Sequence, residues 1–260
     1  MAEMLALEYL LRRDRLIVAV GLTAVVALAW LYLAAGAGMD SDMADMSDMS
    51  DMSMPWSPLH AATAFVMWWV MMIAMMVPSA APTVLLFATI QRKQQVSVGP
   101  SMEAWLLLGG YLLIWAGFSL VAIVAQWGLE QAGLLSMAMA STRTLLTGVI
   151  LLAAGLYQFT PVKNACLRYC QSPVLFLSRY WQAGAGGALR MGLRHGSHCL
   201  GCCWFLMALM FVGGVMNLIW IAGMALYVAA EKLLPLGRGL SRAAGGALIV
   251  SGAIVLARTI

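Results

Sequence analysis

The sequence predicts an all-α membrane protein, a polytopic helix bundle with six or seven transmembrane helices, and three observations support this fold class. The chain is 63% hydrophobic and only 10% charged, whereas soluble domains are about 45–50% apolar and about 25% charged. It contains several apolar stretches of the roughly 20 residues that cross a hydrocarbon layer as a helix. Its Lys and Arg residues gather in alternate connecting segments, which is typical of a polytopic protein.

Four apolar stretches predict transmembrane helices in the first part of the chain: residues 16–35, 63–88, 104–127 and 142–160. Residues 199–234 form an apolar stretch too long for one span, and Gly213-Gly214 near its middle offers a tight turn between two short helices. The last stretch, residues 243–257, is short enough for either a span or a re-entrant segment. The predicted total is therefore six or seven.

The basic residues predict which side of the membrane each connection faces. They precede the first span and follow the second and fourth spans: Arg12, Arg13, Arg15, Arg92, Lys93, Lys163, Arg168, Arg179, Arg190 and Arg194. Because such residues are retained in the cytoplasm, we expect the N-terminus there. Residues 36–62 contain five Asp and no Lys or Arg, so we expect this loop in the periplasm of a bacterial inner membrane.

The predicted organisation has three parts. Residues 1–35 form a cytoplasmic N-terminus with the first membrane anchor, 36–62 form an external Met/Asp-rich loop, and 63–260 form the transmembrane bundle with a cytoplasmic Cys/His region at 161–203. Ala35-Gly36-Ala37 has the form of a signal-peptidase site, which leaves a cleaved signal peptide as an alternative. The preceding apolar run is longer than the roughly 7–15 residues of a signal peptide, so an anchor is favoured.

The external loop carries a methionine repeat, MDSDMADMSDMSDMSM, at residues 39–54. Its thioethers recur at every third residue, each after an aspartate: Met43, Met46, Met49 and Met52. Thioethers are soft, uncharged ligands that suit Cu(I) in an oxidising compartment, and the carboxylates attract cations. A disordered polar linker is the alternative, but linkers normally use Gly, Ser or Pro instead of Met. We therefore interpret the repeat as a metal-capturing segment.

Further methionines lie within the predicted spans. The second span, in MWWVMMIAMMVPSAAP, has one face with three of them and a neighbouring row with two more: Met67, Met71 and Met75, then Met72 and Met76. Met207 and Met210 follow the cysteines on about the same helical side. Adaptable packing is the commoner role of such residues, but their position below the external repeat indicates a path for a soft metal ion.

All five cysteines follow the fourth span, and two histidines accompany them: Cys166, Cys170, His195, His198, Cys199, Cys202 and Cys203. Because none lies in the external loop, we expect reduced thiols near the cytoplasmic side and no disulfides. In a helix, HGSHCLGCC places both histidines and two cysteines on one stripe with Cys203 at its edge, and KNACLRYC places its two cysteines on one face. Thiolates with imidazoles suit Cu(I), zinc or iron; packing of free thiols is the alternative.

Polar positions in the last third of the chain are further candidates. Glu231 and Lys232, in YVAAEKLLP, are ionisable residues at a span end, where a functional role, interface anchoring and local pairing all stay open. Asn217, beside the expected turn, fits a hydrogen bond between helices better than a ligand role.

Three separated motifs carry a resemblance to a known family: MWWVMMIAMMVPSAAP, GLYQFTPVKNACLRYCQSP and GLRHGSHCLGCCWFLMALMFVGGVMNLIWIAGMALYVAAEKLLP. Over residues 56–236 the chain resembles the bacterial family described as predicted metal-binding integral membrane proteins, a domain of unknown function. The resemblance implies that the seven Cys and His residues belong to the family's metal motifs, and that the Met-Met-Pro stretch and Glu231-Lys232 are further signatures. The Asp-Met repeat is not part of the resemblance.

Three classes of function are compatible with these observations. The favoured class is a copper-handling membrane protein that captures Cu(I) at the external loop and holds or delivers it at the Cys/His site, with a metallochaperone or membrane protein as partner. The second is a membrane metalloenzyme or electron carrier with an iron, haem or copper centre; because no c-type haem motif or acid/base set is present, we predict no catalytic residues and favour a non-enzymatic role. The third is an accessory or assembly subunit of a larger membrane complex.

Nucleotides and nucleic acids are not expected ligands. No phosphate-binding Gly-rich motif occurs, and the cytoplasmic loops account for the net charge of +4. The expected surroundings are the lipid bilayer.

Overall fold

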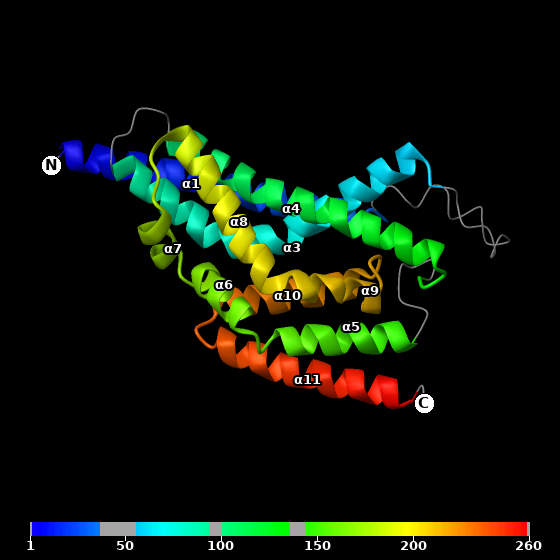
Figure 1. Cartoon of the computed structure of the whole chain (residues 1–260). Coiled ribbons are helices and arrows are strands. Elements are labelled where there is room, and N and C mark those ends of the chain that lie inside the picture. Colours follow the sequence, from blue (N-terminus) through cyan, green and yellow to red (C-terminus); the bar gives the residue numbers. More distant parts are fainter. Residues whose placement is uncertain (1, 37–55, 94–99, 136–143, 259–260) are drawn as a thin grey trace.

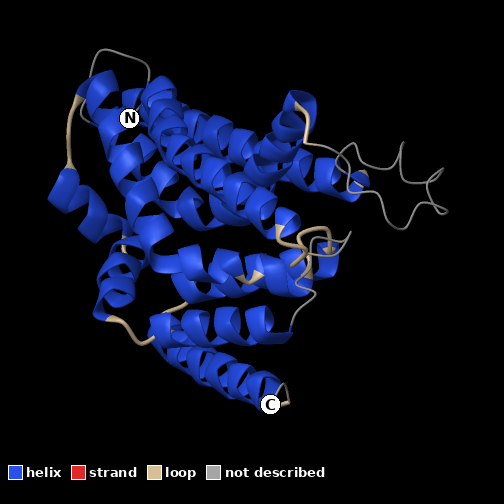
Figure 2. Cartoon of the chain, turned by 45° about the vertical axis from the view of Figure 1, so that its right-hand side comes forward, coloured by secondary structure: helices blue, strands red, loops and turns tan. Residues whose placement is uncertain are grey.

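The computed structural model describes residues 2–36, 56–93, 100–135 and 144–258. Within these ranges every regular element is a helix, as Figures 1 and 2 show, so the predicted all-α class is confirmed there. The methionine repeat lies outside the described residues.

The helices form two groups that pack against each other (Figure 1). The first group consists of α1 (Ala2–Ala34), α3 (Pro58–Lys93), α4 (Pro100–Gln131) and α8 (Gly184–Ala208). The second consists of α5 (Thr144–Tyr157), α6 (Pro161–Gln171), α10 (Leu218–Leu233) and α11 (Gly237–Ala257), while α7 (Pro173–Tyr180) and α9 (Met210–Gly213) are short connecting helices. Contacts of α6 with α8 and of α10 with α3 join the groups.

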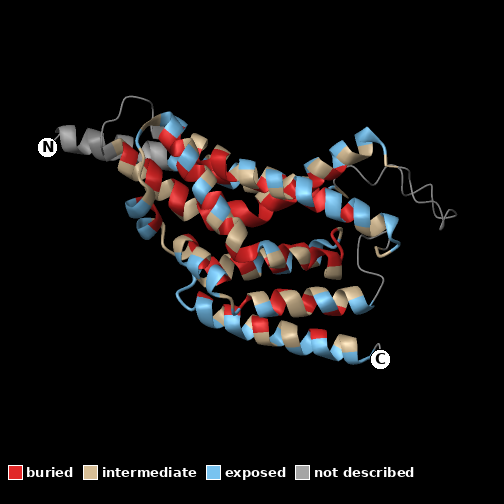
Figure 3. Cartoon of the chain, in the orientation of Figure 1, coloured by how far each residue is buried: buried red, intermediate tan, exposed pale blue. Residues whose placement is uncertain are grey.

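Five helical segments among the described residues are long and apolar enough to cross a membrane: Leu16–Ala34, Pro58–Arg92, Met102–Gln131, Gly184–Gly213 and Gly237–Ala257. A sixth is obtained if the bent pair α5 and α6 counts as one broken span. The lower predicted number, six spans, is reached only if that bent pair is counted as one span. Many large apolar side chains of the described residues are exposed, as expected of helices that face lipid. Figure 3 shows exposed positions along the outer helices.

The predicted span at residues 142–160 differs from the structure, because its helix ends early. α5 has 14 residues, fewer than the roughly 20 that a span needs. Thr160 caps the next helix by accepting a hydrogen bond from the Lys163 amide, and Pro161 occupies its first turn, a combination that starts a helix. The chain therefore bends by 66° between α5 and α6.

The predicted turn within residues 199–234 is confirmed, but the helices around it begin elsewhere. Gly214 adopts a φ of 88°, which glycine tolerates without steric cost. The helix before the turn begins at Gly184, so the HGSHCLGCC motif lies inside a long helix and not at its start. After the turn, α10 has 16 residues. The last helix begins at Gly237 and has 21 residues, which makes it long enough for a span.

The close approach of α4 and α8 depends on two glycines. A Cβ atom at Gly192 would lie 2.0 Å from the carbonyl oxygen of Leu107, and one at Gly110 would lie 2.4 Å from that of Leu189. Small residues of this kind let membrane helices pack backbone to backbone. This contact brings Tyr111 of α4 beside the cysteines of α8.

Candidate metal centre

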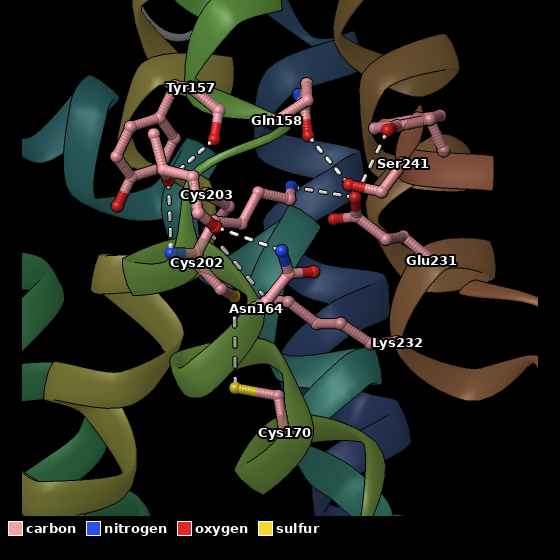
Figure 4. A network of polar contacts seen from close by, with 12 residues as sticks. Tyr157, Gln158, Asn164, Cys170, Cys202, Cys203, Glu231, Lys232 and Ser241 are labelled. Atoms are coloured by element: carbon pink, nitrogen blue, oxygen red, sulfur yellow. Dashed lines mark hydrogen bonds and ion pairs between the residues drawn. The ribbon is translucent and has the colours of Figure 1, made fainter. Parts of the chain in front are cut away.

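Four buried thiols gather where α6 meets α8: Cys170, Cys199, Cys202 and Cys203. The Sγ atoms of Cys202 and Cys170 are 3.9 Å apart (Figure 4). Cys199 lies close enough to interact with the other three thiols. We call these four residues the thiol cluster.

Local helix geometry explains how the cluster forms. On α8, Cys199, Cys202 and Cys203 are three and four residues apart, so they share one helical face, and the Cys202 and Cys203 thiols each donate to the Cys199 carbonyl, at 3.1 and 2.9 Å. On the amphipathic α6, Leu167 and Cys170 are buried on the face that meets α8. The predicted faces of both cysteine motifs are thus brought together.

A buried lysine from a third helix reaches the thiol cluster. Lys232 of α10 is 2% exposed, and its Nζ atom lies 2.9 Å from the Cys199 Sγ atom and 3.8 Å from that of Cys203. The same atom is 3.6 Å from the Met76 Sδ atom and 3.5 Å from the Ser79 Oγ atom. Because a buried ammonium is costly unless it is paired, sulfur and hydroxyl groups from α3 and α8 supply its surroundings.

Tyr111 adds a contact from α4. Its hydroxyl lies 3.0 Å from the Cys199 Sγ atom and donates to the Met76 carbonyl at 3.2 Å. Five helices therefore contribute to the region around the thiols: α3, α4, α6, α8 and α10.

An ion pair behind the cluster ties α6 to α10. Lys163 and Glu231 are both fully buried, with the Nζ and Oε1 atoms 2.7 Å apart. Tyr227 donates its hydroxyl to the same carboxylate at 3.2 Å, and Gln171 donates to the Glu231 carbonyl at 2.9 Å. Next to this pair, Ser241 of α11 donates to the Gln158 side chain at 3.0 Å (Figure 4). Glu231 therefore pairs with a lysine on another helix.

The two histidines of the motif have different surroundings. His195 is buried between the rings of Tyr111 and Phe176, at centroid distances of 5.6 and 4.8 Å, and its Nδ1 atom has no hydrogen-bond partner among the described residues. His198 is half-buried and stacks on Tyr169 with the ring centroids 4.6 Å apart. The aromatic rings of α6 and α7 thus occupy the face of His198.

The remaining predicted residues are not among the four residues of the thiol cluster. Cys166 is half-buried and lies against Gly201, where an added Cβ atom would be 2.8 Å from its Sγ atom. Asn217 caps α10 by accepting from the Trp220 amide at 3.1 Å. The intrahelical methionines named in the prediction are all buried: Met67, Met71, Met75, Met207 and Met210.

The sequence-based prediction did not place three residues at the thiols: Met76, which it named only in a methionine row, Lys232, which it named only at a span end, and Tyr111. Lys232 had a usable signal, because an ionisable residue within an apolar segment indicates function. Met76 belongs to the row of Met72 and not to the row of Met67, Met71 and Met75. The sequence does not show which row meets Lys232, because this depends on how α10 packs on α3. Tyr111 gave no signal, since its role depends on the approach of α4 to α8.

Comparison with known families agrees with the chemistry of these side chains. A family model described as PpoB2, copper chaperone, matches residues 65–255. The chain belongs to this family. The PpoB2 match includes the whole thiol cluster and Lys232, and it leaves the methionine repeat outside. Neither a curated protein nor a solved structure is significantly similar to the chain.

The thiol cluster offers several soft sulfur donors, which suit a copper ion that the protein carries as cargo. No group of three or more His, Cys, Asp and Glu side chains in the described part of the chain is arranged around a common metal position. A pair is available, however, because the Cys170 and Cys202 sulfurs are 3.9 Å apart, and one ion with metal–sulfur bonds of about 2.3 Å can bridge two sulfurs at such a separation. Cu(I) accepts low coordination numbers and prefers sulfur, so the residues present fit this ion.

Proposed function

We propose that this protein is an integral membrane copper chaperone that holds Cu(I) at the thiol cluster, with Cys170 and Cys202 as the central ligand pair. The observation that carries the proposal is the 3.9 Å separation of these two sulfurs. They come from different helices and are buried, in a chain of the PpoB2 copper chaperone family. Deprotonated thiols are the soft ligands that select Cu(I) over the harder divalent ions.

Charge balance supports Cu(I) in this position. One Cu(I) ion with two thiolates carries one net negative charge, which is costly to bury unless it is compensated. The ammonium of Lys232, 2.9 Å from the Cys199 sulfur, supplies the opposite charge. Cys199 and Cys203 are then neighbours that can exchange with the two ligands when the ion enters or leaves.

In this proposal the methionine repeat is the external capture segment and α3 provides a route inward. Thioethers bind Cu(I) without releasing a proton, so an ion can pass between them with little change in charge. Met67, Met71 and Met75 are buried along α3, and Met76 on the same helix contacts Lys232 beside the thiols. Copper then moves from the periplasmic face to the thiols, from which a metallochaperone or a membrane protein accepts it.

Copper content of the purified protein tests the ligand assignment. We expect about one Cu(I) per chain for the native protein and for Cys166→Ser, because Cys166 is half-buried beside Gly201. The double variant Cys170→Ser with Cys202→Ser should lose the bound copper. Equal copper content in the two variants, measured by elemental analysis with the fold checked by circular dichroism, contradicts the assignment.

Deletion of residues 40–53 tests the capture role separately. Copper loading of cells should fall at limiting external copper and reach the native level when copper is abundant, because only the entry step is impaired. If copper loading depends on external copper concentration in the same way after the deletion, the capture role is excluded. The proposal of a thiol site is not affected by that result.

A further inference from the structure

A cavity of about 250 Å³ opens between α6 and α11, and none of the four thiols is among its lining residues. It is lined by Asn164, Ala165, Arg168, Arg238 and Arg242. All three arginines are exposed, and they come from two helices that are far apart in the sequence. Nothing in the copper proposal uses this cavity.

The cavity concentrates positive charge without an acidic partner. Among the described residues no carboxylate forms an ion pair with these three arginines, and the nearest acidic residue along the chain, Glu231, is already bound to Lys163. The first turn of α11 contains no acidic residue, and the N-terminus of a helix carries a partial positive charge. Like charges gathered at a helix N-terminus repel one another unless an anion is bound among them.

We propose that this cavity binds the phosphate headgroup of an anionic phospholipid. The arginine guanidinium group presents paired donors that match phosphate oxygens. The Asn164 amide donates one hydrogen to the Thr160 carbonyl at 3.0 Å and has a second hydrogen to donate. Basic pockets between transmembrane helices on the cytoplasmic side bind anionic lipid headgroups in this way. The ligand class is a diacyl lipid whose phosphate carries net negative charge, such as phosphatidylglycerol.

The surroundings favour a lipid over a free anion as the ligand. Apolar side chains next to the lining residues in the chain are exposed: Val162 at 58%, Leu234 at 51% and Leu236 at 77%. Exposed apolar side chains so close in sequence to a charged cavity suit the acyl chains of a lipid whose headgroup is held inside. The connection from α10 to α11 lies at the same end of the bundle as the N-terminus (Figure 1), which is the end that the basic residues predict to be cytoplasmic.

Native mass spectrometry of the detergent-purified protein tests the proposal with two lipids of identical acyl chains. Phosphatidylglycerol should bind at least about tenfold more tightly than zwitterionic phosphatidylcholine, since basic residues near a membrane surface attract anionic lipids. In Arg238→Gln with Arg242→Gln this preference should fall to about twofold or less. Arg168 is left intact because its guanidinium lies over the Tyr169 ring.

A charge-matched control distinguishes binding at this cavity from a general attraction of anionic lipid to a basic protein. Arg179→Gln with Arg190→Gln removes the same charge from exposed positions on α7 and α8, and this variant should keep the native preference. The lipid site is excluded if both double variants lose the preference equally, or if the native protein shows none. It is also excluded if inorganic phosphate displaces phosphatidylglycerol at equal concentration, because the cavity would then recognise a free anion or the acidic surface of a protein.

Discussion

Lys232 is the buried cation at the thiol cluster. Its ammonium contacts sulfur atoms of Cys199, Cys203 and Met76 and has almost no access to solvent. In the structure these groups surround the cation, and in the proposed copper-bound protein the cation would offset the negative copper–thiolate unit.

Replacement of this lysine by methionine should weaken copper binding and leave the fold intact. In Lys232→Met the buried copper–thiolate unit keeps its negative charge without compensation, so we expect the affinity for Cu(I) to fall at least about tenfold, equivalent to 1.4 kcal/mol. Competition with a chelator of known Cu(I) affinity measures the effect. A folded variant with native affinity would show that Lys232 has no part in copper binding.

At the residue scale, the sequence identified most of the cluster but not its neighbours. The clustering of cysteines after the fourth span was sufficient to predict Cys170, Cys199, Cys202 and Cys203 together, because helical spacing fixes which side chains share a face. The sequence could not separate His198 from the thiols, since its stacking on Tyr169 depends on how α6 crosses α8. Contacts between helices decide such details.

The elements α6 and α10 are held together by the buried pair of Lys163 and Glu231. Glu231→Gln leaves the Lys163 ammonium buried without its carboxylate, and breaking a buried pair in this way costs about 3–5 kcal/mol. We therefore expect a large loss of stability, measured by unfolding in mixed detergent micelles. Lys163→Met with Glu231→Leu removes both charges and should be clearly more stable than the single variant; the reverse order would contradict a structural ion pair.

The crossing of α4 and α8 gives a second test at this scale. In Gly192→Ala the new methyl group meets the Leu107 carbonyl, so the helices must separate and Tyr111 must move away from Cys199. We expect reduced thermal stability and weaker copper retention. Gly186→Ala on the same helix has nothing within 4 Å of the added Cβ atom and should retain both properties; equal effects of the two variants would argue against this contact.

The sequence predicted where apolar segments lie better than where helices bend. Hydropathy marked residues 142–160 as one span, although Thr160 and Pro161 start a new helix at a 66° angle. Conversely, the residues before Cys199 are polar and rich in glycine, so hydropathy did not predict the first half of α8. In that half, Gly187 and Gly192 allow close packing against neighbouring backbone and Gln182, which hydropathy does not measure.

At the scale of the whole molecule, the proposed orientation places the start of α3 outside and α7 inside the cell. A cysteine at Ser57, which is exposed at the start of α3, should react with a membrane-impermeant maleimide in intact cells. A cysteine at Ser178, which is exposed on α7, should react only after permeabilisation. Both variants are made with Cys166→Ser so that the half-buried native thiol does not contribute, and the opposite labelling pattern would invert the proposed topology.

X-ray absorption at the copper edge of the purified Cu(I)-loaded protein tests the central claim most directly. The thiol cluster predicts a copper ion bound by sulfur at about the length of a metal–thiolate bond, roughly 2.3 Å, and predicts that this signal disappears in Cys170→Ser with Cys202→Ser while Cys166→Ser retains it. A spectrum dominated by nitrogen or oxygen ligands, or one that is unchanged in the double variant, would contradict copper binding at these thiols.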